Sequence, residues 1–240
     1  MKLPIMASYN ASENSIAVVF GASGGIGSAL ARALRADARF AQVLCYSRQT
    51  TPAFDLLNED SLRVIAQQAA SHGAIRLAID ATGFLHDADQ KPEKSIKQLS
   101  AAALARAFAL NATGPALLMK HLLPLMPREG KAVFASLSAR VGSIADNQLG
   151  GWYAYRASKA ALNQLIKTAA IESARRNQDL VCLALHPGTV ATRLSEPFAA
   201  QGLHIHTPDE AARHLLAVID QLGPDANGGF YDWRGHAIAW

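Results

Sequence analysis

The segment Gly21-Ala22-Ser23-Gly24-Gly25-Ile26-Gly27 decides how this chain folds. It directly follows an apolar run, Ile16–Phe20, and leads into an alanine-rich helical pattern. Glycines at such a turn let the backbone bend tightly and approach a pyrophosphate, and the start of the helix offers N–H groups and a positive dipole end. The alternative is an ordinary glycine-rich turn, but the placement between a strand and a helix favours dinucleotide binding. The residues predicted to contact the dinucleotide here are Gly21, Ser23, Gly24, Gly25, Ile26 and Gly27.

Short apolar runs alternate with helical patterns along the rest of the chain. The expected strands are apolar throughout, which is typical of parallel strands covered on both faces. The alternation predicts an α/β Rossmann fold, with one doubly wound, mostly parallel sheet of about seven strands and helices on both faces. We expect strands at Ile16–Phe20, Gln42–Ser47, Ile75–Asp80, Ala132–Ser136, Leu180–Leu185 and Phe230–Asp232, with a very short one at Ala53–Asp55. We expect helices at Gly25–Ala36, Ser61–Ser71, Ser100–Leu123, Trp152–Arg176 and Pro208–Leu222.

The chain is expected to form one domain. No linker rich in proline or glycine divides it, and 240 residues suit a single α/β unit. Residues 1–14 are polar and aperiodic, so we expect a flexible arm followed by a single domain over residues 15–240. The stretch Ser195–Thr207 has the composition of a mobile loop over an active site, although a plain surface excursion fits it equally well.

Composition restricts the class of protein. Half of the residues are hydrophobic and 18% are charged, which is enough to bury a large core. The net charge of +4 is mildly basic, but the lysines and arginines are scattered, so nucleic-acid binding is not expected. Cys45 and Cys182 lie in apolar runs and indicate no disulfide framework, as in a reducing cytosol. No apolar stretch reaches membrane-spanning length without glycine, proline or charge, so we expect a cytoplasmic protein without membrane contact.

The end of the second expected strand indicates which dinucleotide binds. An acid there would bond the ribose 2′-hydroxyl of NAD, whereas a cation accommodates the 2′-phosphate of NADP. The strand ends in Cys45-Tyr46-Ser47-Arg48-Gln49, with an arginine and no acid. Arg48 can make charge-assisted hydrogen bonds to a phosphate, and Ser47 can add its hydroxyl. These residues favour NADP(H) over NAD(H), the alternative being that Arg48 is simply an exposed loop arginine.

A tyrosine and a lysine one helical turn apart are the candidate catalytic pair. Tyr155 and Lys159 fall within the expected helix Trp152–Arg176 and share one of its faces. A nearby ammonium favours the phenolate, which makes the tyrosine proton easier to give up or take back. The arrangement suits a general acid/base that works on an alcohol or a carbonyl.

With these motifs in order, the chain resembles the short-chain dehydrogenase/reductase family from about Ile16 to its C-terminus. Within that family it is most similar to the C-factor-like and sniffer-like carbonyl reductases. Two stretches carry the likeness: Gly151-Trp152-Tyr153-Ala154-Tyr155-Arg156-Ala157-Ser158-Lys159-Ala160-Ala161-Leu162-Asn163 and His186-Pro187-Gly188-Thr189-Val190-Ala191-Thr192.

The resemblance implies a role for each of four catalytic residues. Tyr155 would protonate the carbonyl oxygen during reduction. Lys159 would lower the pKa of Tyr155 and hydrogen-bond the nicotinamide ribose. Ser138 would hydrogen-bond the substrate oxygen and stabilise developing charge. Asn111, in the middle of the helix Ser100–Leu123, would hold a water that joins Lys159 to solvent.

The resemblance also implies further cofactor contacts. Asp55 and Leu56 match the place where the family meets the adenine, and the segment after the fourth strand and the Pro-Gly signature would line the rest of the cofactor. These further residues are Ala81, Thr82, Gly83, Pro187, Gly188, Thr189, Val190 and Thr192. No metal is expected, because His204-Ile205-His206 has no third ligand or carboxylate cluster beside it.

The chain departs from the family pattern at three places. Phe20 replaces the threonine that usually precedes the first glycine, and Asp80-Ala81-Thr82-Gly83 replaces the usual Asn-Asn-Ala-Gly. The third departure concerns the serine. Counting back from Gly142-Ser143-Ile144 places Ala139, not Ser138, at the usual serine position. A bulge of one residue would restore Ser138, and Ser136 is the poorer candidate on the same strand.

The motifs and the family resemblance leave two possible functions. The first is an NADPH-dependent oxidoreductase that transfers a hydride between the nicotinamide and a small carbonyl or secondary alcohol. The second is a dinucleotide-binding signalling or regulatory protein with little or no turnover, as the C-factor likeness implies. The helices Ser100–Leu123 and Trp152–Arg176 are rich in Ala and Leu around much of their circumference. This favours a homodimer or homotetramer, unless both faces are buried within one chain.

Overall fold

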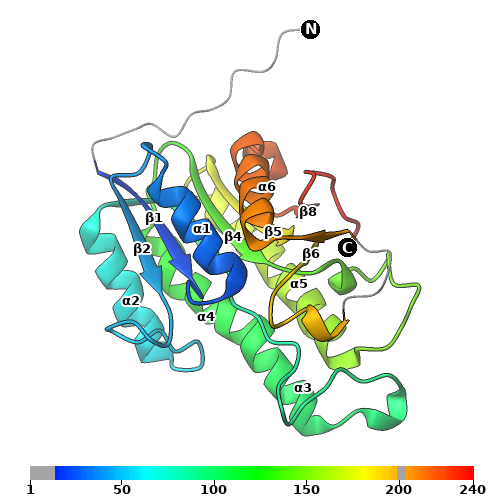
Figure 1. Ribbon diagram of the computed structural model, residues 1–240. Helices are drawn as coiled ribbons and strands as arrows, with labels where there is room; N and C mark the ends of the chain where they lie inside the picture. The colour runs from blue at the N-terminus through cyan, green and yellow to red at the C-terminus, as the bar shows by residue number, and fades with distance from the viewer. Residues whose placement is uncertain (1–13, 199–203) are drawn as a thin grey trace, which may run out of the picture.

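The computed structural model describes residues 14–198 and 204–240 of the chain. Six strands form a central sheet in the spatial order β2-β1-β3-β4-β5-β8, and every neighbouring pair is parallel (Figure 1). This confirms the doubly wound α/β fold. The strands of this sheet are β1 Ser15–Phe20, β2 Gln42–Tyr46, β3 Ala74–Asp80, β4 Ala132–Leu137, β5 Leu180–His186 and β8 Phe230–Asp232.

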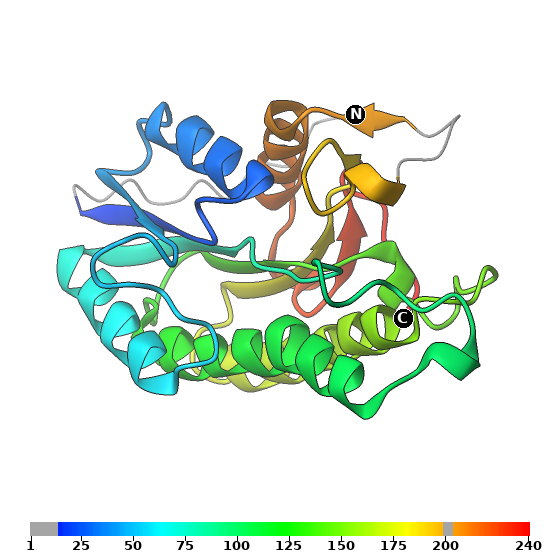
Figure 2. The same cartoon turned by 60° about the horizontal axis from the view of Figure 1, so that its bottom comes forward.

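Helices cover both faces of the sheet (Figure 2), with α1 and α6 on one side and α2, α4 and α5 on the other. Their bounds are α1 Gly25–Arg35, α2 Glu59–His72, α3 Ala101–Phe108, α4 Gly114–Leu122, α5 Tyr153–Ala174 and α6 Pro208–Gln221. Short helical turns join them: η1 Ile96–Gln98, η2 Ala109–Thr113, η3 Leu123–Leu125, η4 Arg140–Gly142, η5 Glu196–Phe198 and η6 Pro224–Ala226.

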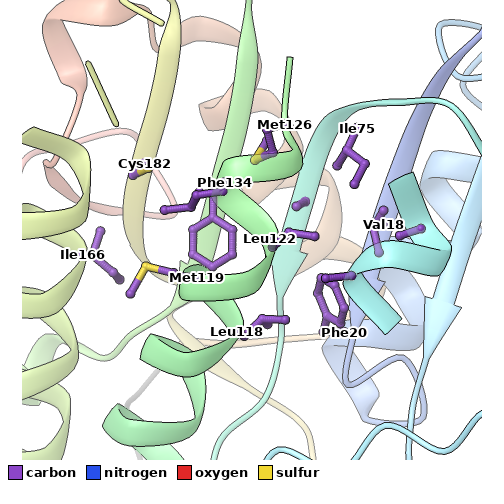
Figure 3. Close-up of a cluster of buried hydrophobic side chains, with 14 of the residues drawn as sticks. Val18, Phe20, Ile75, Leu118, Met119, Leu122, Met126, Phe134, Ile166 and Cys182 are labelled. Atoms are coloured by element: carbon purple, nitrogen blue, oxygen red, sulfur yellow. The ribbon is translucent and has the colours of Figure 1, made fainter. Parts of the chain in front are cut away.

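The core lies in two layers because side chains alternate along each strand. In β1, Val18 and Phe20 face the layer beneath α2, α4 and α5, whereas Val19 faces α1 and α6. Phe134 of β4 lies at the centre of the first layer, between Met119 and the strands, and is fully buried (Figure 3). Every residue of β1 is buried, which explains why the strand is apolar on both faces.

The predicted seventh strand at Ala53–Asp55 is wrong. Its backbone groups bond to a side chain instead of a neighbouring strand, because Ser61 Oγ accepts from Asp55 N and donates to Ala53 O. The sheet therefore ends at β2. A separate parallel pair, β6 Thr189–Val190 with β7 Ile205–His206, was not expected from the sequence.

The helix expected over Ser100–Leu123 is interrupted in the middle. The segment η2 is a π-helical turn, and the Gly114 N–H bonds to the Ala109 carbonyl five residues before it. It separates α3 from α4. Such turns are rare and often occur at functional sites.

One helical segment, Ala101–Leu125, is long and apolar enough to cross a membrane by length and composition alone. It combines α3, η2, α4 and η3. Leu118 and Leu122 of this segment are fully buried in the core, so packing against the sheet accounts for part of its apolar character.

The sheet topology fixes where a ligand binds. From β1 the chain turns outward to β2 and then crosses back to β3 on the other side of β1. In open α/β sheets, ligands bind beyond the carboxyl ends of the strands at such a reversal. The glycine turn after Phe20 and the segment after Asp80 both lie at this point.

Residues 1–13 of the predicted arm and residues 199–203 of the predicted loop lie outside the described residues.

Candidate active site

The glycine turn presents the bare start of α1. Gly24 is the N-cap of this helix, no side chain caps it, and its first turn contains no acid. Ser23, Gly24 and Gly25 are exposed. The N–H groups and positive dipole end at this terminus are therefore open to an anion, as a pyrophosphate site requires.

Two glycines of the turn are needed for close packing. A Cβ on Gly27 would lie 2.3 Å from the Gly21 carbonyl oxygen. Gly21 has a φ of +76°, and a Cβ there would lie 3.0 Å from the backbone of Ala81. Side chains at either position would clash, so the turn packs directly on the end of β3. This fit supports a dinucleotide at the reversal of strand order.

The end of β2 lies beside the turn. The N–H groups of Gly21 and Ala22 both donate to the Tyr46 carbonyl oxygen, at 2.9 and 3.1 Å. Ser47 is buried and its Oγ accepts from Gln49 N, whereas Arg48 is exposed directly beyond it. The structure therefore brings the Arg48 position close to the glycine turn.

The segment after β5 forms another wall of the same site. Thr192 reaches the glycine turn, since a Cβ on Gly25 would lie 2.7 Å from its Cγ2. Gly188 has a φ of +79° and packs against His206 and Trp233. Pro187 and Val190 belong to this segment, in which β6 pairs with β7.

Two other predicted cofactor residues are held by local contacts. Leu56 is buried and packs on Gly114 of α4, where a Cβ would lie 2.4 Å from Leu56 Cγ. Asp55 is exposed, and its Oδ1 accepts from Leu57 N at 2.9 Å. A side chain at Gly114 would push Leu56 away from α4, so this glycine fixes the position of the segment.

Asp80 ends β3 as a fully buried carboxylate. Its Oδ1 accepts from Thr82 N at 3.0 Å and from Thr82 Oγ1 at 2.6 Å. Its Oδ2 accepts from Ser136 Oγ at 2.7 Å. The departure from the family's Asn-Asn-Ala-Gly thus introduces a hydrogen-bonded negative charge beneath the site.

Asn111 lies in the π-turn η2 and is fully buried. Its Oδ1 accepts from Phe84 N at 2.7 Å, and its Nδ2 donates to Phe84 O at 2.8 Å and to Ser158 Oγ at 3.1 Å. The amide therefore joins the loop after β3 to the helix α5. Gly83 lies between Asn111 and Lys159, because a Cβ there would be 4.0 Å from Asn111 Oδ1 and 3.8 Å from Lys159 Nζ.

Tyr155 and Lys159 lie on one face of α5, as the spacing predicted. Lys159 is only 2% exposed, and its Nζ lies 6.0 Å from the centroid of the Tyr155 ring. Its ammonium donates to the Leu137 carbonyl oxygen at 2.8 Å. Burial lowers the pKa of Lys159 to about 8, and the charge of Asp80 opposes this effect. The expected lowering of the Tyr155 pKa by Lys159 is wrong for this structure: burial raises the pKa of the phenol, so the tyrosine is protonated at neutral pH.

Ser138 follows β4 and is 4% exposed. Its Oγ donates to Asn163 Oδ1 at 2.6 Å. The register between β4 and β5 continues without a shift to Leu137, and Ser138 N bonds to Leu185 O, so the ladder holds no bulge of the kind expected there. Ser136 is bonded to Asp80, and partly buried Ala139 follows Ser138.

The structure brings most of the predicted site residues to one edge of the sheet. Asn111 bonds to Ser158, the residue before Lys159 on α5, and Gly83 lies next to both Asn111 and Lys159. The Lys159 Nζ lies 6.0 Å from the centroid of the Tyr155 ring. Asn163, which accepts the hydrogen bond from Ser138, was not among the predicted site residues. Its position four residues after Lys159, on the same helical face, was a usable signal.

Known proteins match this chain in sequence and in fold. A family model described as short chain dehydrogenase matches residues 15–202. The C-signal of Myxococcus xanthus is 37% identical over 137 residues, which cover 57% of this chain and 78% of that protein. The 1-hydroxy-2-glutathionyl-2-methyl-3-butene dehydrogenase of Rhodococcus sp. is 31% identical over 189 residues, or 79% of each chain.

Solved structures show the same fold. The carbonyl reductase Sniffer of D. melanogaster has a TM-score of 0.79 at 24% identity, covering 95% of this chain and 99% of that one. An NADPH-bound carbonyl reductase from chicken fatty liver has a TM-score of 0.81 at 23% identity, covering 98% and 96%. Because the family model and the Rhodococcus relative each span most of the sequence, the chain belongs to the short chain dehydrogenase family and is an oxidoreductase that uses a nicotinamide dinucleotide.

Proposed function

We propose that this protein reduces a small carbonyl compound to the alcohol with NADPH, and runs the reverse reaction with NADP⁺. The observation that carries the proposal is the pair of half-buried Tyr155 and buried Lys159 on one face of α5, beside Asn111 at the carboxyl edge of the sheet. Regulatory binding without turnover is not favoured, because it does not require an acid/base pair at this position.

Tyr155 supplies the proton in this reaction. The bound nicotinamide supplies the hydride that adds to the carbonyl carbon. Tyr155 Oη gives its proton to the carbonyl oxygen, so that the alcohol forms and a phenolate remains. The Lys159 ammonium, 6.0 Å from the centroid of the ring, favours the negative charge of the phenolate. A proton from solvent then restores the phenol, and the Asn111 side chain holds the adjoining backbone of Phe84 in place.

Two features support a preference for NADP(H). Arg48 is exposed where the end of β2 meets the glycine turn, and the strand end contains no acid to bond a ribose 2′-hydroxyl. An arginine at this position gives paired, charge-assisted hydrogen bonds to a 2′-phosphate.

Ser138 has a supporting role in this proposal. Its single hydroxyl proton is donated to Asn163, so contact with a substrate oxygen as a donor would require that bond to break. We therefore assign most of the polarisation of the carbonyl to Tyr155, and assign to Ser138 the fixing of β4 against α5.

Apolar helix surface supports a homo-oligomer. In the most apolar 18 residues of Ala101–Leu125, only 39% of the residues are buried within the chain. On α5, Ile171 is 55% exposed and Leu165 is 36% exposed. Packing these helices against a second copy would remove this surface from water.

Replacing Tyr155 with Phe keeps the ring and deletes the proton donor. We expect kcat to fall by about 10²–10⁴-fold on any aldehyde, ketone or quinone that the wild type reduces. NADPH oxidation followed by absorbance measures this, with Tyr153→Phe, two residues earlier in the same helical turn, as the matched control. Wild-type turnover by Tyr155→Phe would refute the mechanism.

Replacing Arg48 with Ala removes the expected partner of the 2′-phosphate. Because charge-assisted hydrogen bonds are worth about 1.5–3 kcal/mol, the Kd for NADPH should rise by roughly 10- to 100-fold. The Kd for NADH should change little. Titration with both cofactors measures the effect, and the exposed Arg175→Ala at the far end of α5 is the control. An unchanged NADPH affinity would contradict the assignment.

Replacing Ser138 with Ala tests its supporting role. Loss of a donor that stabilises the reacting oxygen directly costs about 10²–10³-fold in kcat. We expect less than about tenfold here, since the hydroxyl bonds Asn163. A loss of 100-fold or more would instead show that Ser138 contacts the substrate oxygen.

Light scattering coupled to gel filtration measures the oligomeric state. We expect a dimer or tetramer that Ile171→Glu shifts towards the monomer, because a charge would then be buried at the contact. Leu149→Glu is the control, since Leu149 is 93% exposed on a loop. A wild-type monomer at micromolar concentration would exclude the assembly.

A further inference from the structure

The helix that carries the catalytic pair begins in a strained turn. Gly150 and Gly151 have φ values of 63° and 65°, and Trp152, the N-cap of α5, has a φ of 51°. A left-handed conformation is unfavourable for a bulky side chain, so it persists only where surrounding contacts enforce it. Tyr155 is the third residue of this helix. If the backbone of the Gly150–Trp152 turn changed conformation, the ring of Tyr155 would move.

The helix has no cap of its own. Trp152 makes no side-chain capping bond, and the first turn of α5 contains no acidic residue. The first N–H groups of a helix need acceptors, and negative charge is favourable beside them. The acceptor must therefore come from another part of the chain.

Glu93 supplies it from the loop between β3 and η1. Its Oε2 accepts from Ala154 N at 3.2 Å, across a separation of 61 residues. Its backbone oxygen accepts from Trp152 N at 2.5 Å. Glu93 is only 4% exposed. One buried residue thus holds both the N-cap and the second residue of α5.

Arg156 fixes the same turn from the helix side. Its Nε donates to Gly151 O at 3.0 Å, and its Nη2 donates to Gly150 O at 3.1 Å. The two glycine carbonyls and the Trp152 N–H are therefore all bonded. The strained backbone lies between Glu93 and Arg156.

The restraint on the turn reaches Tyr155 through the Trp152 side chain. The two rings meet edge to face, with centroids 6.2 Å apart and planes at 67°. Such contacts define ring orientation as well as burial. Because the path from Glu93 to Tyr155 runs through ring packing, the role of Glu93 is to position the ring.

We propose that Glu93 is a positioning residue for the reaction, capping α5 from the loop after β3 and holding Trp152 in the conformation that orients Tyr155. The inference rests on the proposed function of Tyr155. It adds that the loop which reaches the site after β3 also determines the geometry of the proton donor.

Three variants test the proposal. Glu93→Ala removes the bond to Ala154, Glu93→Gln keeps an acceptor oxygen without the charge, and Glu210→Ala is the matched control. Glu210 accepts from Thr207 N at the start of α6, on the opposite face of the sheet. We expect Glu93→Ala to lower kcat at least tenfold with the NADPH Kd within twofold. Glu93→Gln should retain at least a third of kcat with the wild-type pH profile, and Glu210→Ala should retain the wild-type kcat.

Amide hydrogen exchange gives a readout that does not depend on turnover. Without cofactor, the Ala154 amide should exchange at least tenfold faster in Glu93→Ala than in the wild type or in Glu210→Ala. Unchanged exchange would overturn the cap, whatever the activity. If Tyr155→Phe proved fully active, the proposed function would fail while the exchange result still decided whether Glu93 holds the helix.

Other outcomes also overturn the proposal. A kcat for Glu93→Ala within threefold of the wild type, an equal loss in Glu210→Ala, or an equal loss in Glu93→Gln would each do so. If Glu93→Ala does not fold, Trp152→Gly tests the same path, because glycine accepts the left-handed conformation and deletes only the ring. It should lower kcat at least fivefold, and a wild-type kcat would show that Trp152 does not orient Tyr155.

Discussion

The buried ammonium of Lys159 is the interaction on which the site depends. A lysine that is 2% exposed requires an acceptor, and the Leu137 carbonyl at the end of β4 provides it. This bond requires α5 to pass close to the end of β4. Gly142 makes the approach feasible, because a Cβ there would lie 2.9 Å from Lys159 Cβ. The position of α5, and with it that of Tyr155, follows from satisfying one buried charge.

A second charge balances the first. Asp80 is fully buried at the end of the adjacent strand, and three hydrogen bonds from Thr82 and Ser136 satisfy its carboxylate. Its charge raises the pKa of Lys159 against the effect of burial. Each of the two charged groups beneath the site is therefore hydrogen-bonded, and the edge of the sheet can hold both charges in an apolar surrounding.

The sequence predicted what depends on local spacing and missed what depends on distant partners. The glycine turn after Phe20 and the shared face of Tyr155 and Lys159 follow from strand, turn and helix periods, and the structure has them. The apparent strand at Ala53–Asp55 failed because Ser61, a residue outside it, takes its backbone groups. The helical period places Asn163 on the face of Lys159, but it does not show that the hydroxyl of Ser138, 25 positions away, bonds to it.

Two helical segments at the site contain irregular backbone: the π-turn η2 between α3 and α4, and the left-handed start of α5. The loop between β3 and η1 bonds to both of them. The π-turn of Asn111 is bonded to Phe84, and the left-handed Trp152 is bonded to Glu93. Phe84 and Glu93 lie towards the two ends of the loop between β3 and η1. Between them, His86 contacts Leu194 in the segment after β5. Substitutions in the middle of this loop can therefore change the contacts with a substrate, while Phe84 and Glu93 keep Asn111 and Tyr155 in place.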